Sequence, residues 1–81
     1  MRGTGLVGWG RDVLYAYFMV DGGSTRVRLS VDEADRLDVV QGLRVRLALP
    51  GREPADGLVM GVRREPPFAW VELAPLANRA G

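Results

Sequence analysis

The chain has 81 residues, enough for one domain, and its 47% hydrophobic and 26% charged residues are typical of a folded globular protein. It contains no cysteine, histidine or lysine, which excludes disulfides and removes the usual general base and the commonest metal ligand. The net charge of +1 gives no overall attraction to nucleic acid or anionic membranes, so any such binding has to come from a local patch.

The first half of the chain predicts three strands. Residues 4–9 are typical of a short strand that contains several glycines. Residues 13–20 are apolar on both faces, and their length, flanking glycines and β-branched and aromatic side chains favour a strand over a buried helix. Residues 21–24 contain a Gly-Gly pair that suits a tight hairpin, and residues 25–29 then alternate between polar and apolar side chains.

A short helix is expected next, at about residues 31–38. Ser30 and Glu33 form a capping-box pattern, in which the Ser30 hydroxyl accepts a hydrogen bond from the Glu33 amide. Acidic residues crowd the first turn, where the helix dipole favours them. Gly42 stands where the helix is expected to end.

The second half of the chain predicts the remaining strands. Residues 43–49 alternate again, and residues 50–57 form an exposed loop with two prolines, which cannot donate to a strand ladder. Residues 58–63 and 68–73 are the last two strands, with turn residues between them.

Short strands at a spacing of about ten residues, separated by turns, are typical of an antiparallel barrel or sandwich. The chain is too short for two full sheets. We therefore expect a mostly β fold, a small antiparallel barrel (SH3-like or similar) of five to six strands with one short connecting helix. Residues 1–74 are expected to form this single domain, and residues 75–81 a C-terminal tail.

The composition offers little for catalysis. The hydroxyl groups have no imidazole to activate them, and no Gly-x-Ser-x-Gly elbow is present. The acidic residues gather mainly on the expected helix and lack the spacing of a calcium loop. Residues 3–8 match the dinucleotide-binding pattern G-x-G-x-x-G, but no strand is expected before them and no helix after them. The sequence predicts a protein that is not an enzyme and uses no metal or other cofactor.

Four arginines, Arg26, Arg28, Arg44 and Arg46, alternate outward on two strands that follow one another in the sequence. If these strands are neighbours, the four guanidinium groups share one face, where like charges repel. Two explanations stay open: surface salt bridges with nearby aspartates, or a face that binds phosphate or an acidic partner. The aspartates concerned are Asp21, Asp32, Asp35 and Asp38.

The strand at residues 13–20 has two apolar rows, of which a single sheet buries one. The smaller and more aliphatic row is assigned to the core; it consists of Leu14, Ala16, Phe18 and Val20. The other row, Tyr15, Tyr17 and Met19, is then left to face a partner, which we expect to be another chain.

Phe68 and Trp70 share one face of the last strand. Either they pack in the core, or they turn outward because Ala69, Val71 and Leu73 can fill it. Exposed, they would suit base stacking or a protein interface, in which tyrosine, tryptophan and arginine are enriched. We therefore include both in a candidate protein interface with the tyrosine row.

Two stretches resemble known families. Residues 26–47 resemble the strand–short helix–strand core of AbrB-type swapped-hairpin DNA-binding proteins, although Ser30 stands where that family usually has proline. Residues 41–73 are similar in cadence to PilZ domains and SH3-like barrels, with an alternating strand after Gly42 and a closing aromatic strand. The paired-arginine and Asp-x-Ser-x-x-Gly signals by which PilZ domains bind a cyclic dinucleotide are absent. No site residue is carried over from either resemblance.

The leading interpretation is a non-catalytic binding or assembly module that docks on a protein partner or self-associates. The alternative is nucleic-acid or nucleotide-phosphate binding through the arginine face, which the adjacent acidic helix would offset. The N-terminus lacks the apolar segment of a signal peptide, and the apolar run at residues 13–20 is too short to cross a membrane. We therefore expect a soluble, cytoplasmic protein that makes no membrane contact.

Overall fold

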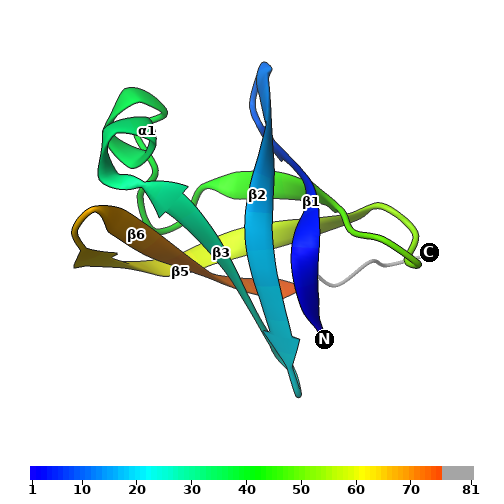
Figure 1. Cartoon of the computed structure of the whole chain (residues 1–81). Helices are drawn as coiled ribbons and strands as arrows, with labels where there is room; N and C mark the ends of the chain where they lie inside the picture. Colours follow the sequence, from blue (N-terminus) through cyan, green and yellow to red (C-terminus); the bar gives the residue numbers. More distant parts are fainter. Residues whose placement is uncertain (76–81) are drawn as a thin grey trace.

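The computed structural model describes residues 1–75, which form a barrel of six antiparallel strands and one short helix (Figure 1). The elements are β1 (Arg2–Trp9), β2 (Asp12–Asp21), β3 (Ser24–Ser30), α1 (Val31–Arg36), β4 (Arg44–Ala48), β5 (Ala55–Glu65) and β6 (Phe68–Pro75). The barrel closes in the order β1-β2-β3-β6-β5-β4. The expected small antiparallel barrel with a short connecting helix is confirmed. Pro75 still belongs to β6, and residues 76–81 of the predicted tail lie outside the described residues.

Tight turns join the first three strands into two hairpins. Trp9 pairs with Asp12 across the first turn, and Gly10 within that turn has a φ of 68°. The second turn contains Gly22, with a φ of 62°. Side chains disfavour this left-handed region, and glycine enters it freely. The glycines therefore set the places where the chain reverses.

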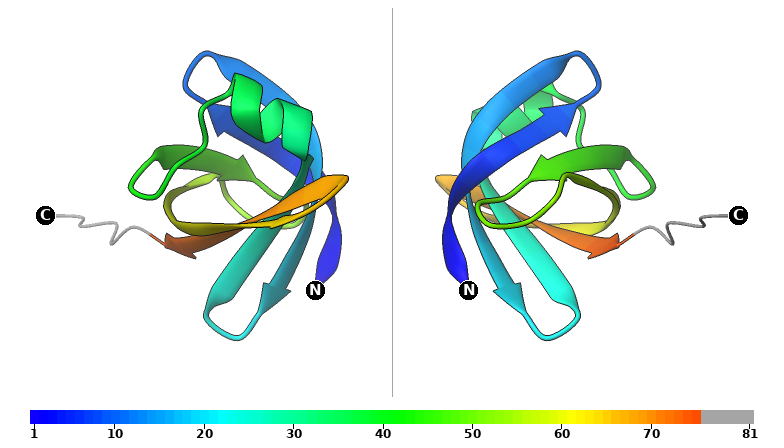
Figure 2. Two further views of the ribbon diagram at one scale, coloured as in Figure 1. Left: turned by 90° about the vertical axis from the view of Figure 1, so that its left-hand side faces the viewer. Right: turned by 90° about the vertical axis from the view of Figure 1, so that its right-hand side faces the viewer.

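The strands β3 and β4 follow one another in the sequence but lie on opposite walls of the barrel. β3 lies between β2 and β6, whereas β4 lies between β1 and β5. The connection between them runs through α1, which lies across one end of the barrel (Figure 2). The strands β3 and β4 are thus separated by the full width of the core.

The helix α1 begins where the sequence predicts it. The Ser30 hydroxyl accepts a hydrogen bond from the Glu33 amide at 3.0 Å, the first bond of a capping box. Ala34 is the buried residue of α1, and it packs on the barrel core. With α1 six residues long, no helix within the described residues is long and apolar enough to cross a membrane.

The helix ends earlier than expected, and Gly42 has no part in its end. Asp38 adopts a left-handed conformation with a φ of 54°, and its amide donates to the carbonyl of Asp35 at 3.1 Å. The amide of Val39 donates to the carbonyl of Ala34, also at 3.1 Å. These two bonds form a Schellman motif, a standard helix ending. Aspartate tolerates this conformation better than most residues, so it takes the place usually held by glycine.

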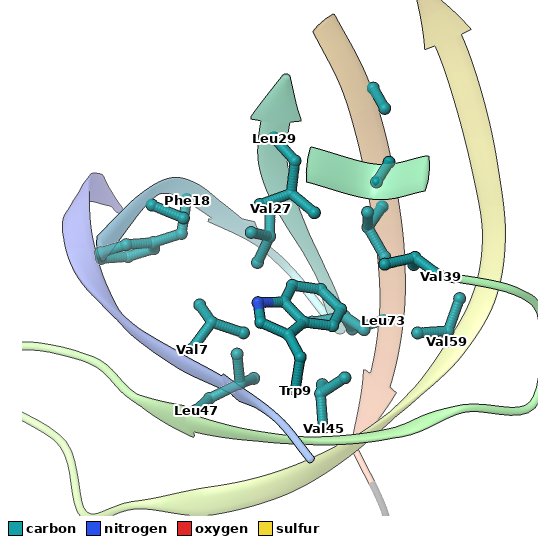
Figure 3. Close-up of a cluster of buried hydrophobic side chains, with 14 of the residues drawn as sticks. Val7, Trp9, Phe18, Val27, Leu29, Val39, Val45, Leu47, Val59 and Leu73 are labelled. Carbon is teal, nitrogen blue, oxygen red and sulfur yellow. The ribbon is translucent and has the colours of Figure 1, made fainter. Parts of the chain in front are cut away.

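Apolar side chains from all six strands fill the barrel (Figure 3). Trp9 lies in the middle of this cluster and is 4% exposed. Its indole N–H has no hydrogen-bond partner within the described residues. The largest fully buried side chains are Phe18, Leu73, Val7, Val27, Val45, Val59 and Val71.

Two glycines of β1 offer a matched test of this packing. A Cβ atom on Gly5 would lie 3.0 Å from Leu49 Cδ2 and 3.1 Å from the Ala48 carbonyl oxygen, so both neighbours would have to move by a few tenths of an ångström, and one of them is backbone. We expect Gly5→Ala to lower the free energy of unfolding by about 1–3 kcal/mol, the usual cost of overpacking. A Cβ atom on Gly8 would be 3.6 Å from the nearest side-chain atom, an ordinary contact. Gly8→Ala should therefore be neutral or stabilising by about 0.5 kcal/mol, and equal urea midpoints for both variants would contradict this packing.

Candidate functional site

The four arginines do not share one face. Arg26 and Arg28 lie on β3, and Arg44 and Arg46 lie on β4, which is three strand positions away in either direction around the barrel. The predicted four-arginine surface is therefore wrong. The prediction assumed that consecutive strands are neighbours, whereas the α1 connection carries the chain across the end of the barrel.

The ion pairs of these arginines also differ from the expected ones. Arg46 pairs with Asp56 on the neighbouring strand β5 at 3.1 Å. Within the described residues, the other three arginines of this set form no ion pair. Asp35, an expected partner, instead pairs with Arg64 and so ties α1 to β5. None of the four arginines is neutralised by the aspartates that the sequence suggested.

Arg28 is surrounded by aromatic rings. In the strand register it lies between Tyr17 on β2 and Trp70 on β6. Its Cζ atom lies 4.8 Å from the ring centre of Tyr17 and 4.4 Å from that of Phe68. Both distances are in the range of cation–π attraction, which holds the guanidinium group in place.

The tyrosine row of β2 faces outward, as predicted. Tyr15 is 74% exposed, and Tyr17 and Met19 are half-buried on the outside, whereas Phe18 on the opposite row is buried. The reason is the period of two along a strand, which sends alternate side chains to opposite faces.

Phe68 and Trp70 also turn outward, while Ala69, Val71 and Leu73 of the same strand are buried in the core. The rings of Tyr17 and Trp70 meet edge to face, with their centres 6.2 Å apart and their planes at 78°. Three neighbouring strands thus bring Tyr17, Phe68 and Trp70 together around Arg28, and Tyr15 lies on the same outer row of β2. We call this surface the aromatic–arginine face; it consists of Tyr15, Tyr17, Arg28, Phe68 and Trp70.

A hollow of about 540 Å³ opens beside this face, next to Trp70. Its lining includes Met19, Arg26 and Trp70, which the sequence singled out, and five residues that it did not: Gly61, Val62, Arg63, Glu65 and Glu72. A Cβ atom at Gly61 would meet nothing within 4 Å, so the missing side chain leaves this part of the hollow open. The surface that the structure assembles is therefore larger than the predicted one.

The charges around the hollow nearly cancel. Arg63 pairs with Glu65 at 2.8 Å, and Arg26 lies opposite Glu72 in the register of β3 and β6. Together with Arg28, these residues amount to three arginines and two glutamates, a local net charge of +1. The surface carries both signs of charge and is not a continuous basic patch.

Other features weighed in the sequence carry no site. Residues 3–8, which match G-x-G-x-x-G, lie inside β1, and the next element is the strand β2, so no helix N-terminus faces them. Within residues 1–75, no three acidic side chains gather closely enough to hold a metal ion.

One missed residue was within reach of sequence reasoning. The turn at Pro66 and Pro67 pairs Glu65 with Phe68, and counting back along the hairpin then places Arg63 opposite Trp70. The role of Gly61 could not be found in this way, because the register between β5 and β6 shifts at this point.

Comparison of the chain with models of known protein families, with curated proteins and with solved structures found no match.

Proposed function

We propose that this protein is a non-catalytic binding or assembly module that docks on a protein, either a different chain or a second copy, through the aromatic–arginine face. The observation that carries the proposal is the gathering of Tyr17, Phe68 and Trp70 around Arg28 on one outer wall, away from the core, with the exposed Tyr15 on the same outer row of β2 as Tyr17. Tyrosine, tryptophan and arginine are the residues most enriched at the energetic centres of protein interfaces.

Neighbouring apolar residues enlarge this surface. Leu6 pairs with Tyr15 in the register of β1 and β2 and is 44% exposed, and Val13 on β2 is 63% exposed. Large apolar patches on the outside of a small domain are typical of interaction sites. A thin core also gains from a partner, because a domain of this size rarely supplies more than about 5 kcal/mol by itself.

The absence of histidine, cysteine and lysine from the sequence supports a non-catalytic role. Ser30 caps α1, and Ser24 lies at the hairpin between β2 and β3. We also propose that the protein acts in the cytoplasm. This location and a kinship with SH3-like barrels stay predictions.

A second candidate function is binding to single-stranded nucleic acid. Arg26 and Arg28 form no ion pair within the described residues, and aromatic rings next to arginines suit base stacking. Arg44 and Arg46, on the far wall, cannot contribute to the same contact. Phosphate binding weakens steeply as salt rises, whereas apolar docking does not, so a salt titration separates the two functions.

The charge-introducing variant Tyr17→Glu tests the proposal. A carboxylate at the centre of an apolar contact should weaken association at least about 30-fold, the effect of losing an interface hot spot. Val40→Glu is the control, since Val40 is a similarly apolar, exposed residue in the loop between α1 and β4. Sedimentation velocity measures association with a second copy. Hydrogen exchange of the complete assembly, in the protein's native partner complex, measures protection of β2, β3 and β6.

The proposal predicts loss of association in Tyr17→Glu and its retention in Val40→Glu. A wild-type protein that stays monomeric, and whose β2 and β6 amides no partner protects, would contradict it.

A further inference from the structure

Arg28 indicates which chemical group binds the aromatic–arginine face, because its side chain is held in place but has no anionic partner. Tyr17 and Phe68 attract its cation through their ring faces, and ring faces accept no strong hydrogen bond. Within the described residues, the Arg28 side chain donates no hydrogen bond and forms no ion pair. A guanidinium group has five N–H donors in a fixed fork that matches a carboxylate or a phosphate. The geometry leaves this fork free for an anion from outside.

The local charge favours a single carboxylate over a polyanion. A nucleic acid brings one phosphate per nucleotide and binds through several cations along its path. Here the hollow next to Trp70 is lined by Glu65 and Glu72 as well as by Arg26 and Arg63, and Arg63 is already paired with Glu65. A phosphate chain that crosses this surface would meet two carboxylates. A lone carboxylate on Arg28 meets neither.

The position of Arg28 also argues against a second copy as occupant. β3 is the middle strand of the three that carry the aromatic–arginine face. In a twofold interface the same patch faces itself, so residues near its centre approach their own copies. Two Arg28 side chains would then meet with no carboxylate between them, which is unfavourable once water is excluded. An acidic group from a different chain removes this conflict.

The hollow next to Trp70 accommodates a neighbouring side chain of the same segment. Met19 and Trp70 give it apolar walls, and Gly61 leaves it unobstructed. Its charged residues are matched in number, with Arg26 opposite Glu72 and Arg63 paired with Glu65. The hollow therefore favours neither sign of charge, and Met19 and Trp70 are the part of its lining that an apolar side chain can contact, while the charge is recognised at Arg28.

We infer that the partner is a protein segment that places an aspartate or glutamate carboxylate on Arg28 and an adjacent apolar side chain in the hollow beside Trp70. The inference rests on the proposed protein-binding function and specifies its partner. Because two rings already fix Arg28, binding loses little side-chain freedom there, and this preorganisation strengthens the contact.

A panel of capped pentapeptides tests this inference. Each peptide has a central glutamate flanked by leucine, phenylalanine, tyrosine or tryptophan, and each has a twin with glutamine in its place. Nitrogen-15 NMR titration of the protein should show saturable shifts at Tyr17, Arg28 and Trp70 for glutamate peptides. Their glutamine twins should bind about tenfold more weakly, because a hydrogen bond between charged groups is lost.

Three variants assign the effect to its residues. Arg28→Gln should abolish the preference for glutamate, whereas Arg44→Gln should keep it, since Arg44 is exposed on the opposite wall and forms no ion pair within the described residues. Gly61→Val should weaken binding about tenfold by filling the hollow, and its Cβ atom would meet nothing within 4 Å. A dispersed NMR spectrum of each variant shows that it is folded.

The outcomes separate this inference from the proposed function. Equal affinity for glutamate and glutamine peptides would contradict recognition of a carboxylate by Arg28 and would leave the proposed protein binding in place. If the isolated protein forms a dimer and Tyr17→Glu dissociates it, the partner at this face is a second copy and the inference of an acidic segment is wrong. No shift at this face with any peptide at millimolar concentration would overturn the inference. If single-stranded oligothymidylate then bound the same residues with a steep salt dependence, the proposed function would fail as well.

Discussion

Phe18→Ala is expected to lower the free energy of unfolding by about 3–5 kcal/mol, the usual cost of removing a buried ring. Phe18 is 1% exposed and lies on the inner row of β2. Its ring also packs beside Gly3, where an added Cβ atom would lie 3.7 Å from Phe18 Cε1. A domain of this size has few kcal/mol to lose, so a large part of the variant population should be unfolded at 37 °C. Urea denaturation followed by tryptophan fluorescence measures the change.

The neighbouring variant Tyr17→Ala is the control for this experiment. Tyr17 precedes Phe18 on the same strand but lies on the outer row, half-buried, so its truncation leaves no cavity in the core. We expect it to cost about 1 kcal/mol, the contribution of its aromatic contact. Similar losses in both variants would show that β2 does not sort its two rows between core and surface.

Trp70→Ala is expected to weaken binding as strongly as Tyr17→Glu, by at least about 30-fold in affinity. Trp70 contacts Tyr17 edge to face, lies beside Arg28 in the strand register and lines the hollow, so its removal disturbs all parts of the surface. Its ring is outside the core, so the unfolding free energy should fall far less than in Phe18→Ala. Calorimetric titration of the purified partner, or of the tightest glutamate peptide, measures the affinity.

Val40→Ala is the matched control for Trp70→Ala, because it removes an exposed apolar side chain away from the aromatic–arginine face. Its affinity should equal that of the wild type. An unchanged affinity in Trp70→Ala would show that the partner does not bind the aromatic–arginine face.

Local patterns were sufficient to predict most of the fold. Alternation along a strand is decided within a few residues, so the inner row with Phe18 and the outer row with Tyr17 could be assigned from the sequence. The start of α1 at Ser30 could be assigned for the same reason, since an N-cap depends on neighbouring residues. The end of α1 was harder to predict from the sequence. Asp38 adopts the left-handed conformation that ends the helix, whereas glycine is the usual residue there and Gly42 was the expected candidate.

Strand order is a property of the whole chain and could not be derived from local patterns. Arg28 and Arg44 appear equivalent in the sequence, yet one lies among aromatic rings and the other on the far wall. The aromatic members of the site were therefore predicted, but their arrangement around a single arginine was not. The hollow escaped prediction for a similar reason, since it depends on the register shift at Gly61.

The two apolar rows of β2 have a consequence for the unfolded chain. Between Asp12 and Asp21 this strand has no charged residue, no proline and no glycine, a composition that favours pairing between copies whenever the barrel opens. The aspartates at both ends act as gatekeepers, because stacking the segment in register brings equal charges together at each edge. The same side chains that make an outer wall suitable for a partner thus make the nascent protein prone to aggregate, and these two carboxylates oppose that outcome before any partner is present.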